Sequence, residues 1–217
     1  MVRAILTDIE GTTTSLNFVK DELFPYALER LPYFISNNRE RLDEVYKQME
    51  EIFEPGIETS LVIQVMLDWM ARDIKSTPLK TVQGMIWEEG YAKHELRGHL
   101  YEDAFNTLRS WYLKSIPVYI YSSGSVQAQK LLFKHSMYGD ISKLLSGHFD
   151  TTIGSKLESS SYKAIAESLN LPVEDILFLS DNPVEIDAAF LAGMQVQLVD
   201  RDGRAPYSVK SFYELAF

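Results

Sequence analysis

The sequence contains no cysteine and no long apolar run. Without cysteine, the chain has neither a disulfide framework nor thiolate ligands for a metal. No window reaches the roughly 18 consecutive apolar residues of a membrane-spanning helix. The opening residues, MVRAILTD, bring in an acid where the apolar part of a secretory signal would continue. We therefore expect a soluble protein with a cytoplasmic location, which would extend to the nucleus in a eukaryote.

Positive charge is also scarce. The 21 Lys and Arg residues face 31 Asp and Glu residues, and the formal net charge is -10. Such a charge argues against a nucleic-acid partner and against binding to an anionic membrane. The 217 residues, of which 46% are hydrophobic, suffice for one large domain or for a domain with a sizeable insertion. We find no internal repeat in the sequence, and we expect a monomer.

Helical periodicity dominates the first hundred residues. Apolar residues recur at three- and four-residue steps over residues 39–53 and over residues 61–70, which predicts two amphipathic helices. After the opening apolar residues 4–6, we find no convincing strand up to about Ala104. From Pro117 onward, short apolar runs alternate with helical stretches. The predicted strands are 118–121, 147–149, 176–179 and 196–199, and the predicted helices between them are 126–134, 159–169 and 183–192.

This alternation predicts the fold class. Strands separated by helices form right-handed crossovers in a parallel sheet, so we expect an α/β fold with a Rossmann-like core. Pro183 suits the first turn of a helix, and Gly193 suits its end. The early helices then form an α-helical cap that is inserted after the first strand. We predict a catalytic core of residues 1–15 and 105–217 and a helical cap of residues 16–104.

Polar residues follow the predicted strands at their carboxyl ends. The stretch LTDIEGTTT leads from the first strand into two acids that are one residue apart, then into a glycine and three threonines. Because the carboxyl ends of parallel strands meet at one edge, residues far apart in the sequence converge there on one crevice. The candidate residues at these ends are Asp8, Glu10, Ser122, Ser123, Lys156 and Asp181.

This set of residues favours phosphoryl transfer. Mg²⁺ prefers a few oxygen ligands and keeps its waters, which suits Asp8 and Asp181. Asp8 can attack phosphorus and form an aspartyl-phosphate, while Glu10 can protonate the leaving oxygen and later take a proton from water. Lys156 and the Ser122 hydroxyl can hold the phosphoryl oxygens. A simpler interpretation stays open, because acids and serines at strand ends also cap helices.

Four segments resemble the motifs of the haloacid dehalogenase superfamily. They are DIEGTTT at 8–14, YSSGSVQAQKLLF at 121–133, GSKLESSSY at 154–162 and FLSDNPVEIDAA at 178–189. The superfamily usually opens with D-x-D. Glutamate as the second acid, followed by Gly-Thr-Thr, is similar to the enolase-phosphatase branch in particular. The resemblance implies a haloacid dehalogenase-like core with a cap after its first strand.

The resemblance also implies roles for the strand-end residues. The nucleophile would be Asp8 and the acid/base would be Glu10. One Mg²⁺ per subunit would be bound by Asp8, Glu10 and Asp181. The substrate contacts would be Ser122, Ser123 and Lys156.

The implied activity begins with a small phosphorylated diketone. An enzyme of this branch would convert 2,3-diketo-5-methylthiopentyl-1-phosphate to an enol and then remove the phosphate, which gives the acireductone of methionine salvage. Two alternatives stay open. One is a broader small-metabolite phosphatase of the same superfamily. The other is a phospho-accepting receiver-like signalling module, against which the D-x-E spacing, the acid after the fourth strand and the long insertion all argue.

Overall fold

The computed structural model describes residues 2–215 and divides the chain into two compact units. The first unit joins the segment up to Phe18 to the segment from Arg97 onward. The second unit is the continuous segment Val19–Leu96. None of the helices within residues 2–215 combines the length and the apolar character needed to cross a bilayer.

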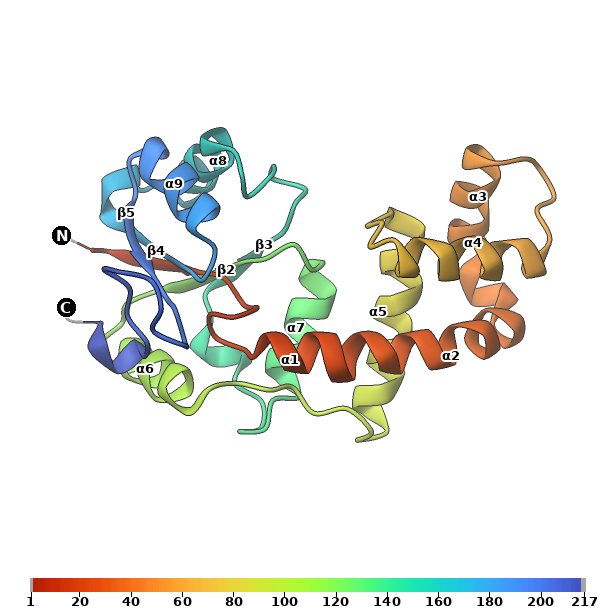
Figure 1. Ribbon diagram of the computed structural model, residues 1–217, viewed down its shortest axis with the longest axis horizontal. Helices are drawn as coiled ribbons and strands as arrows, with labels where there is room; N and C mark the ends of the chain where they lie inside the picture. The colour runs from red at the N-terminus through yellow and green to blue at the C-terminus, as the bar shows by residue number, and fades with distance from the viewer. Residues whose placement is uncertain (1, 216–217) are drawn as a thin grey trace. The chain divides into compact units, whose positions relative to one another are not determined.

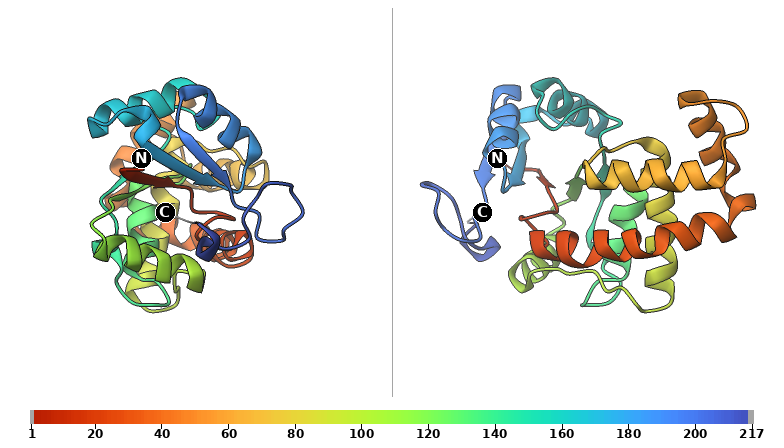
Figure 2. Two further views of the ribbon diagram at one scale, coloured as in Figure 1. Left: turned by 90° about the vertical axis from the view of Figure 1, so that its left-hand side faces the viewer. Right: turned by 45° about the vertical axis from the view of Figure 1, so that its right-hand side comes forward.

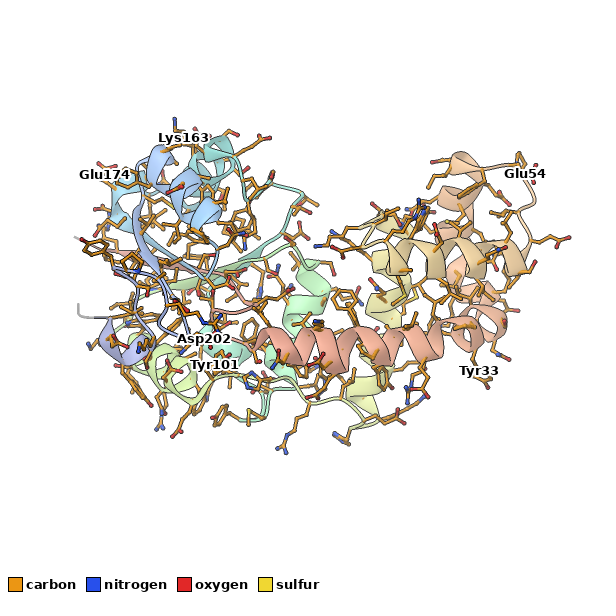
Figure 3. The ribbon with its side chains drawn as sticks, in the orientation of Figure 1. Tyr33, Glu54, Tyr101, Lys163, Glu174 and Asp202 are labelled. Atoms are coloured by element: carbon orange, nitrogen blue, oxygen red, sulfur yellow. The ribbon has the colours of Figure 1, made fainter. Side chains whose placement is uncertain are left out.

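The second unit is built from helices. Trp87 fixes its first turns, because the indole N–H donates to the Leu23 carbonyl oxygen over 2.8 Å and the ring meets Phe24 edge to face. Tyr33 projects from this unit into solvent (Figure 3). The elements are a π-helical turn Val19–Leu23, α2 (Phe24–Asn37), a 3-10 helix Arg39–Leu42, α3 (Asp43–Ile52), α4 (Thr59–Ala71) and α5 (Thr77–Ala92).

The helix predicted over residues 39–53 is present but begins in a different geometry. Its first turn is a 3-10 helix, and the α-helix starts only at Asp43. Such tight turns are common where a helix begins. Here the tight turn buries Leu42 completely, while the Arg39 guanidinium reaches Asp43 Oδ1 at 2.8 Å and lies over the Tyr46 ring.

The first unit is built on a five-stranded parallel sheet, with the order β3-β2-β1-β4-β5 (Figures 1 and 2). In the central strand, Thr7 lies opposite Ile120 on one side and Leu179 on the other. The predicted strands are confirmed to within one residue at each end. They are β1 (Ala4–Thr7), β2 (Val118–Tyr121), β3 (Gly147–Phe149), β4 (Ile176–Ser180) and β5 (Gln195–Leu198).

Local signals set the helices of this unit. The Ser125 hydroxyl accepts the Ala128 N–H at the start of one helix, and Pro183 occupies the first turn of another. Gly193, at a φ of 102°, ends that helix in the left-handed conformation that glycine favours. The helices are α1 (Leu16–Phe18), α6 (Glu102–Leu113), α7 (Val126–Lys134), α8 (Ser159–Leu169) and α9 (Pro183–Ala192), with 3-10 turns at Ser142–Leu144, Val173–Asp175 and Phe212–Glu214.

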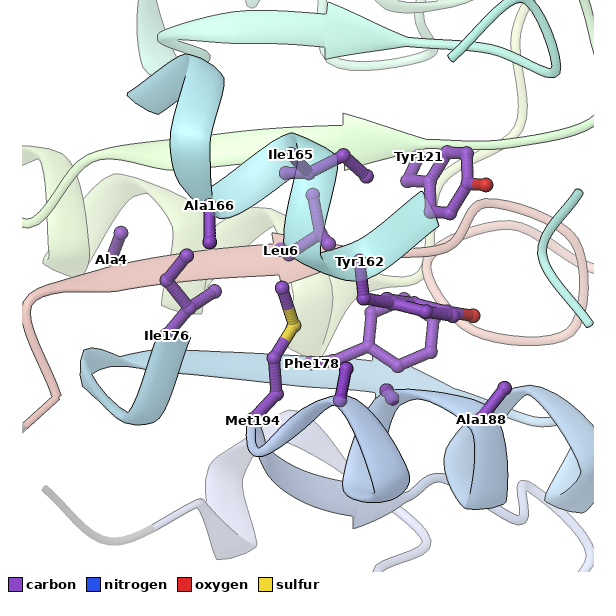
Figure 4. Packing of buried hydrophobic residues seen from close by; sticks show 12 residues of the cluster. Ala4, Leu6, Tyr121, Tyr162, Ile165, Ala166, Ile176, Phe178, Ala188 and Met194 are labelled. Atoms are coloured by element: carbon purple, nitrogen blue, oxygen red, sulfur yellow. The ribbon is translucent and has the colours of Figure 1, made fainter. Parts of the chain in front are cut away.

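Helices cover both faces of the sheet, with α8 and α9 on one side and α6 and α7 on the other (Figure 2). Phe178 on β4 packs edge to face against Tyr162 on α8, at 5.0 Å between ring centroids (Figure 4). This buried core holds the strands in register, so their carboxyl ends form one edge. The cluster contains Ala4, Leu6, Tyr121, Tyr162, Ile165, Ala166, Ile176, Phe178, Ala188, Ala189, Ala192 and Met194.

One histidine makes the stability of this unit sensitive to acid. His148 on β3 is half-buried, and its Nδ1 lies 3.1 Å from the side-chain oxygen of Gln129. Burial, and after it the charge of Lys130, lowers the pKa of His148 from 6.5 to about 4. Between these two pH values, His148 therefore takes up a proton in the unfolded chain but not in the folded protein. The contribution of His148 to stability is complete above pH 6.5 and is lost as the pH falls towards 4.

We expect His148→Gln to unfold less readily in acid than the wild type, because glutamine keeps a polar group next to Gln129 and does not titrate. Thermal unfolding at about pH 7.5 and about pH 5 measures this. The wild type should lose roughly 2–4 °C more in melting temperature than the variant between the two conditions. His94→Gln, at an exposed position, is the matched control and should behave like the wild type. Equal losses in all three proteins would show that His148 does not carry the effect.

Candidate active site

Three of the predicted site residues lie at the carboxyl ends of neighbouring strands. Asp8 follows β1, Ser122 follows β2 and Asp181 follows β4. The backbone joins two of these ends directly, because the Asp8 N–H donates to the Leu179 carbonyl oxygen over 2.9 Å. The parallel order of the three strands thus brings side chains from the beginning, the middle and the end of the chain to one edge.

Lys156 reaches the same place from the loop before α8. Its Nζ lies 2.5 Å from Asp8 Oδ1, although 148 positions separate the two residues, and both residues are 5% exposed. The loop is fixed around the lysine, since the Tyr162 hydroxyl donates to the Lys156 carbonyl oxygen over 2.7 Å and the Tyr121 hydroxyl donates to Gly154. Lys156 and Asp8 therefore form a buried ion pair with a defined geometry.

A second carboxylate pairs with the same lysine. Lys156 Nζ lies 2.7 Å from Glu185 Oε2, which also accepts the Ser180 hydroxyl over 2.8 Å. Glu185 is buried in the first turn of α9. No motif or spacing in the sequence singles out Glu185. The available signal is its place in the first turn of the helix predicted over residues 183–192, which begins two residues after Asp181.

The charges of these groups shift their proton affinities. Burial by itself would lower the pKa of Lys156, but the carboxylates of Asp8 and Glu185 outweigh it and hold that pKa above its usual value. The lysine stays protonated. Burial first, and then the charges of Asp8 and Glu185, raise the pKa of Asp181 to about 7. Burial and the charge of Asp8 likewise raise the pKa of Glu185, against the attraction of Lys156.

The turn after Asp8 is shaped around Asp181. Gly11 has a φ of +72°, and a Cβ at this position would lie 2.0 Å from Asp181 Oδ2. The Asp181 N–H donates to the Thr12 hydroxyl over 2.9 Å. Glycine is therefore required here both for its backbone conformation and for the space that the carboxylate occupies. This contact explains why a glycine follows the two acids in LTDIEGTTT.

The remaining predicted residues lie at the same edge. Glu10 is half-buried in the turn that follows β1. Ser122 is buried, and its hydroxyl oxygen accepts the Gly124 N–H over 3.2 Å, while Ser123 is half-buried beside it. The Ser122 N–H donates to the Phe149 carbonyl oxygen, which ties this loop to β3. The assigned roles of these three residues stay predictions.

The donor set suits a divalent cation. Asp8 and Glu185 are buried beside Lys156, and Asp181 is half-buried. Burial first, and then the charges of Asp8 and Glu185, raises the pKa of Asp181. A hard cation such as Mg²⁺ prefers these oxygen donors. Within residues 2–215, no three His, Asp or Glu side chains are placed together so that they could hold a metal ion by themselves. A cation at this edge would therefore need water or phosphate oxygens in addition to the carboxylates.

Comparison with known proteins identifies several relatives. A family model described as haloacid dehalogenase-like hydrolase matches residues 2–193. The chain is 48% identical to Enolase-phosphatase E1 of Aquifex aeolicus, over 99% of each chain. It is 50% identical to Enolase-phosphatase E1 of Azotobacter vinelandii, over 93% of this chain and 90% of that one. A solved structure, the UTR4 protein of Saccharomyces cerevisiae, has a TM-score of 0.85 at 32% identity and covers 99% of this chain and 100% of its own.

Gly11→Ala tests whether the space beside Asp181 matters for function. The new methyl group would push the Asp181 carboxylate away, so we expect hydrolysis of a small phosphate ester to fall on the order of 100-fold. The matched control is Gly139→Ala, because Gly139 has a φ of +82° and no heavy atom within 4 Å of an added Cβ.

Both variants introduce the same kind of backbone strain, which costs about 1 kcal/mol of stability in each. Gly11→Ala should lose more than this, because its methyl group also meets Asp181. Only Gly11→Ala should also lose activity. Full activity of Gly11→Ala at a temperature where it is folded would show that the close contact with Asp181 has no catalytic importance. Steady-state kinetics and thermal unfolding of both variants give the result.

Proposed function

The chain belongs to the haloacid dehalogenase-like hydrolase family, in its enolase-phosphatase branch, and we propose that it converts 2,3-diketo-5-methylthiopentyl-1-phosphate to the acireductone of methionine salvage and phosphate. The main support is the buried contact between Lys156 Nζ and Asp8 Oδ1 at the edge of the sheet. This contact fixes the orientation of the Asp8 carboxylate beside the positively charged Lys156 ammonium group. Identity of 48% to an enolase-phosphatase over nearly the full length supports the substrate.

Asp8 is the nucleophile in this proposal. Its carboxylate attacks phosphorus, the bond to the leaving oxygen breaks, and an aspartyl-phosphate forms that water then hydrolyses. Lys156 holds Asp8 Oδ1 and so fixes the direction of attack. Because it stays protonated, Lys156 also attracts the phosphoryl oxygens, whose charge changes in the transition state.

Glu10 is the acid/base in this proposal. Glu10 follows Asp8 by two residues. The chain then turns at Gly11, before the threonines. Glu10 would give a proton to the leaving oxygen and then take one from the attacking water. The Ser122 hydroxyl and the neighbouring Ser123 would hold the phosphate from the β2 side.

Mg²⁺ is the cofactor in this proposal, one ion per subunit, and Asp8, Glu10 and Asp181 would hold it. When bound, the ion would supply positive charge that neutralises the carboxylates and the phosphoryl group. Glu185 has a different role in this proposal: it pairs with Lys156 and keeps that lysine directed at Asp8.

Three further expectations remain predictions. They are a catalytic core of residues 1–15 and 105–217 with a helical cap of residues 16–104, a monomeric state, and a cytoplasmic location. None is needed for the chemistry at Asp8. The proposed substrate makes a direct test possible without them.

The diketo phosphate separates the proposed activity from a broader phosphatase. We expect an enol product to appear together with released phosphate. Ultraviolet absorbance detects the enol. The wild type should prefer this substrate over sugar phosphates and other small phosphate esters. Phosphate release without any enol product, or a clear preference for sugar phosphates, would support the broader phosphatase instead.

Metal removal provides the second arm of this experiment. Without a metal ion, the carboxylates would repel one another and the anionic substrate. EDTA should therefore abolish phosphate release, and added Mg²⁺ should restore it. The Asp8→Asn variant is the control for the covalent step, because it keeps the shape of the side chain without the attacking charge. Full activity in EDTA would contradict the assignment of Mg²⁺.

A further inference from the structure

An arginine outside the recognised motifs binds the turn that follows the nucleophile. Arg201 lies in the loop after β5, and its side chain is 15% exposed. Its Nε and Nη2 donate to the Thr12 carbonyl oxygen over 3.1 and 2.5 Å. Its Nη1 pairs with Asp103 Oδ2 at 2.5 Å, and that carboxylate is 12% exposed. The guanidinium therefore joins the Thr12 peptide to the start of α6.

Aromatic rings enclose the same guanidinium. It lies 4.2 Å from the centroid of the Tyr101 ring and 5.2 Å from that of Phe212. Figure 3 labels Tyr101 and Asp202, which belong to the two segments that meet here. Contacts with two rings restrict a planar guanidinium far more than they would restrict a lysine ammonium.

Asp103 links this arginine to the C-terminal segment. Its Oδ2 also accepts the Ser211 hydroxyl over 2.8 Å and the Phe212 N–H over 2.6 Å. Burial alone would raise the pKa of Asp103, but Arg201 and these donors outweigh it and hold that pKa below its usual range. The pair thus stays charged, and the segment around Phe212 is held against α6.

The backbone of the loop is fixed as well. The Asp200 carboxylate accepts the N–H groups of Arg204 and Ala205, and the Asp200 N–H donates to the Val209 carbonyl oxygen over 2.9 Å. The Val209 N–H returns a hydrogen bond to Leu198. The loop therefore closes on itself directly after β5, and Arg201 extends from an anchored backbone.

Thr12 connects Arg201 to the acids of the site. Its carbonyl oxygen accepts from Arg201, while its hydroxyl accepts the Asp181 N–H. The preceding residue, Gly11, lies against the Asp181 carboxylate. A shift of the Thr12 peptide would therefore move Gly11 and the backbone of Asp181 together, and it would disturb the turn that leaves Asp8.

We propose that Arg201 is a positioning residue for the phosphatase reaction, which acts through the Thr12 peptide to hold the turn after Asp8 and the backbone of Asp181 in the reactive geometry. The inference rests on the proposed function, because that function assigns Asp8 and Asp181 their roles. Asp103 serves the arginine as counter-ion. Neither Arg201 nor Asp103 touches the reacting atoms.

The test compares Arg201→Lys and Arg201→Ala with Arg204→Met. Lysine keeps the charge but cannot present two N–H groups of one plane to the Thr12 oxygen. Arg204 is the matched control, because it lies three residues away in the same loop and its side chain is 82% exposed. We expect kcat of the Arg201 variants to fall about 10- to 100-fold, as is found for other residues that orient a reactive group. Their KM should stay within about twofold of the wild-type value, because Arg201 does not bind the substrate.

A readout other than the loss of rate separates positioning from plain stability. Added guanidinium should restore part of the kcat of Arg201→Ala, whereas methylammonium should not. Arg204→Met should keep both kcat and melting temperature. If Arg201→Ala does not fold, Asp103→Asn replaces it, because it removes the charge of the counter-ion with little change of shape and should give a smaller loss of kcat.

An unchanged kcat in folded Arg201 variants, with only a lower melting temperature, would overturn the inference. So would an equal loss of kcat in Arg204→Met. Asp8→Asn, assayed in parallel, separates this inference from the proposed function. An active Asp8→Asn variant would overturn the function itself, whereas an inactive one beside fully active Arg201 variants would overturn the positioning role alone.

Discussion

A buried lysine between two buried carboxylates is the interaction on which the rest of this site depends. Lys156 Nζ lies 2.5 Å from Asp8 and 2.7 Å from Glu185. A carboxylate at this depth is costly unless a cation is next to it. Lys156 can meet that need only because the sheet edge, the loop before α8 and the first turn of α9 converge. The ion pairs therefore link the fold of the core to the orientation of the Asp8 carboxylate.

The turn after Asp8 is held from several directions. The absence of a side chain at Gly11 leaves room for Asp181, and Thr12 bonds to Asp181 on one side and to Arg201 on the other. Residues far from the reacting atoms thus help to keep the acids in place before substrate arrives. Such preorganisation lowers the barrier because little rearrangement is left for the reaction itself. The loop after β5 contributes to this although it carries no recognised motif.

Apolar runs and end signals are sufficient to predict the strands and the helices α7, α8 and α9. The runs at 118–121 and 176–179 read as strands, and Pro183 with Gly193 marked both ends of α9. These are local properties of the chain. Glu185 and Arg201 escaped the sequence analysis because their importance lies in contacts with residues that are distant in the sequence. The 3-10 turn at Arg39–Leu42 was missed for a related reason, since an amphipathic pattern does not distinguish a tight first turn from an α-helical one.

If Asp8 is the nucleophile, it becomes phosphorylated during turnover, and the phosphorylated residue can be identified. The reaction would be quenched during steady-state turnover, and any acyl phosphate on the protein would be reduced with borohydride. The protein would then be digested, and mass spectrometry would identify the modified peptide. The account predicts reduction at Asp8 that requires both substrate and Mg²⁺. Modification of a different residue, or turnover without a covalent intermediate under conditions that trap a control acyl phosphate, would contradict it.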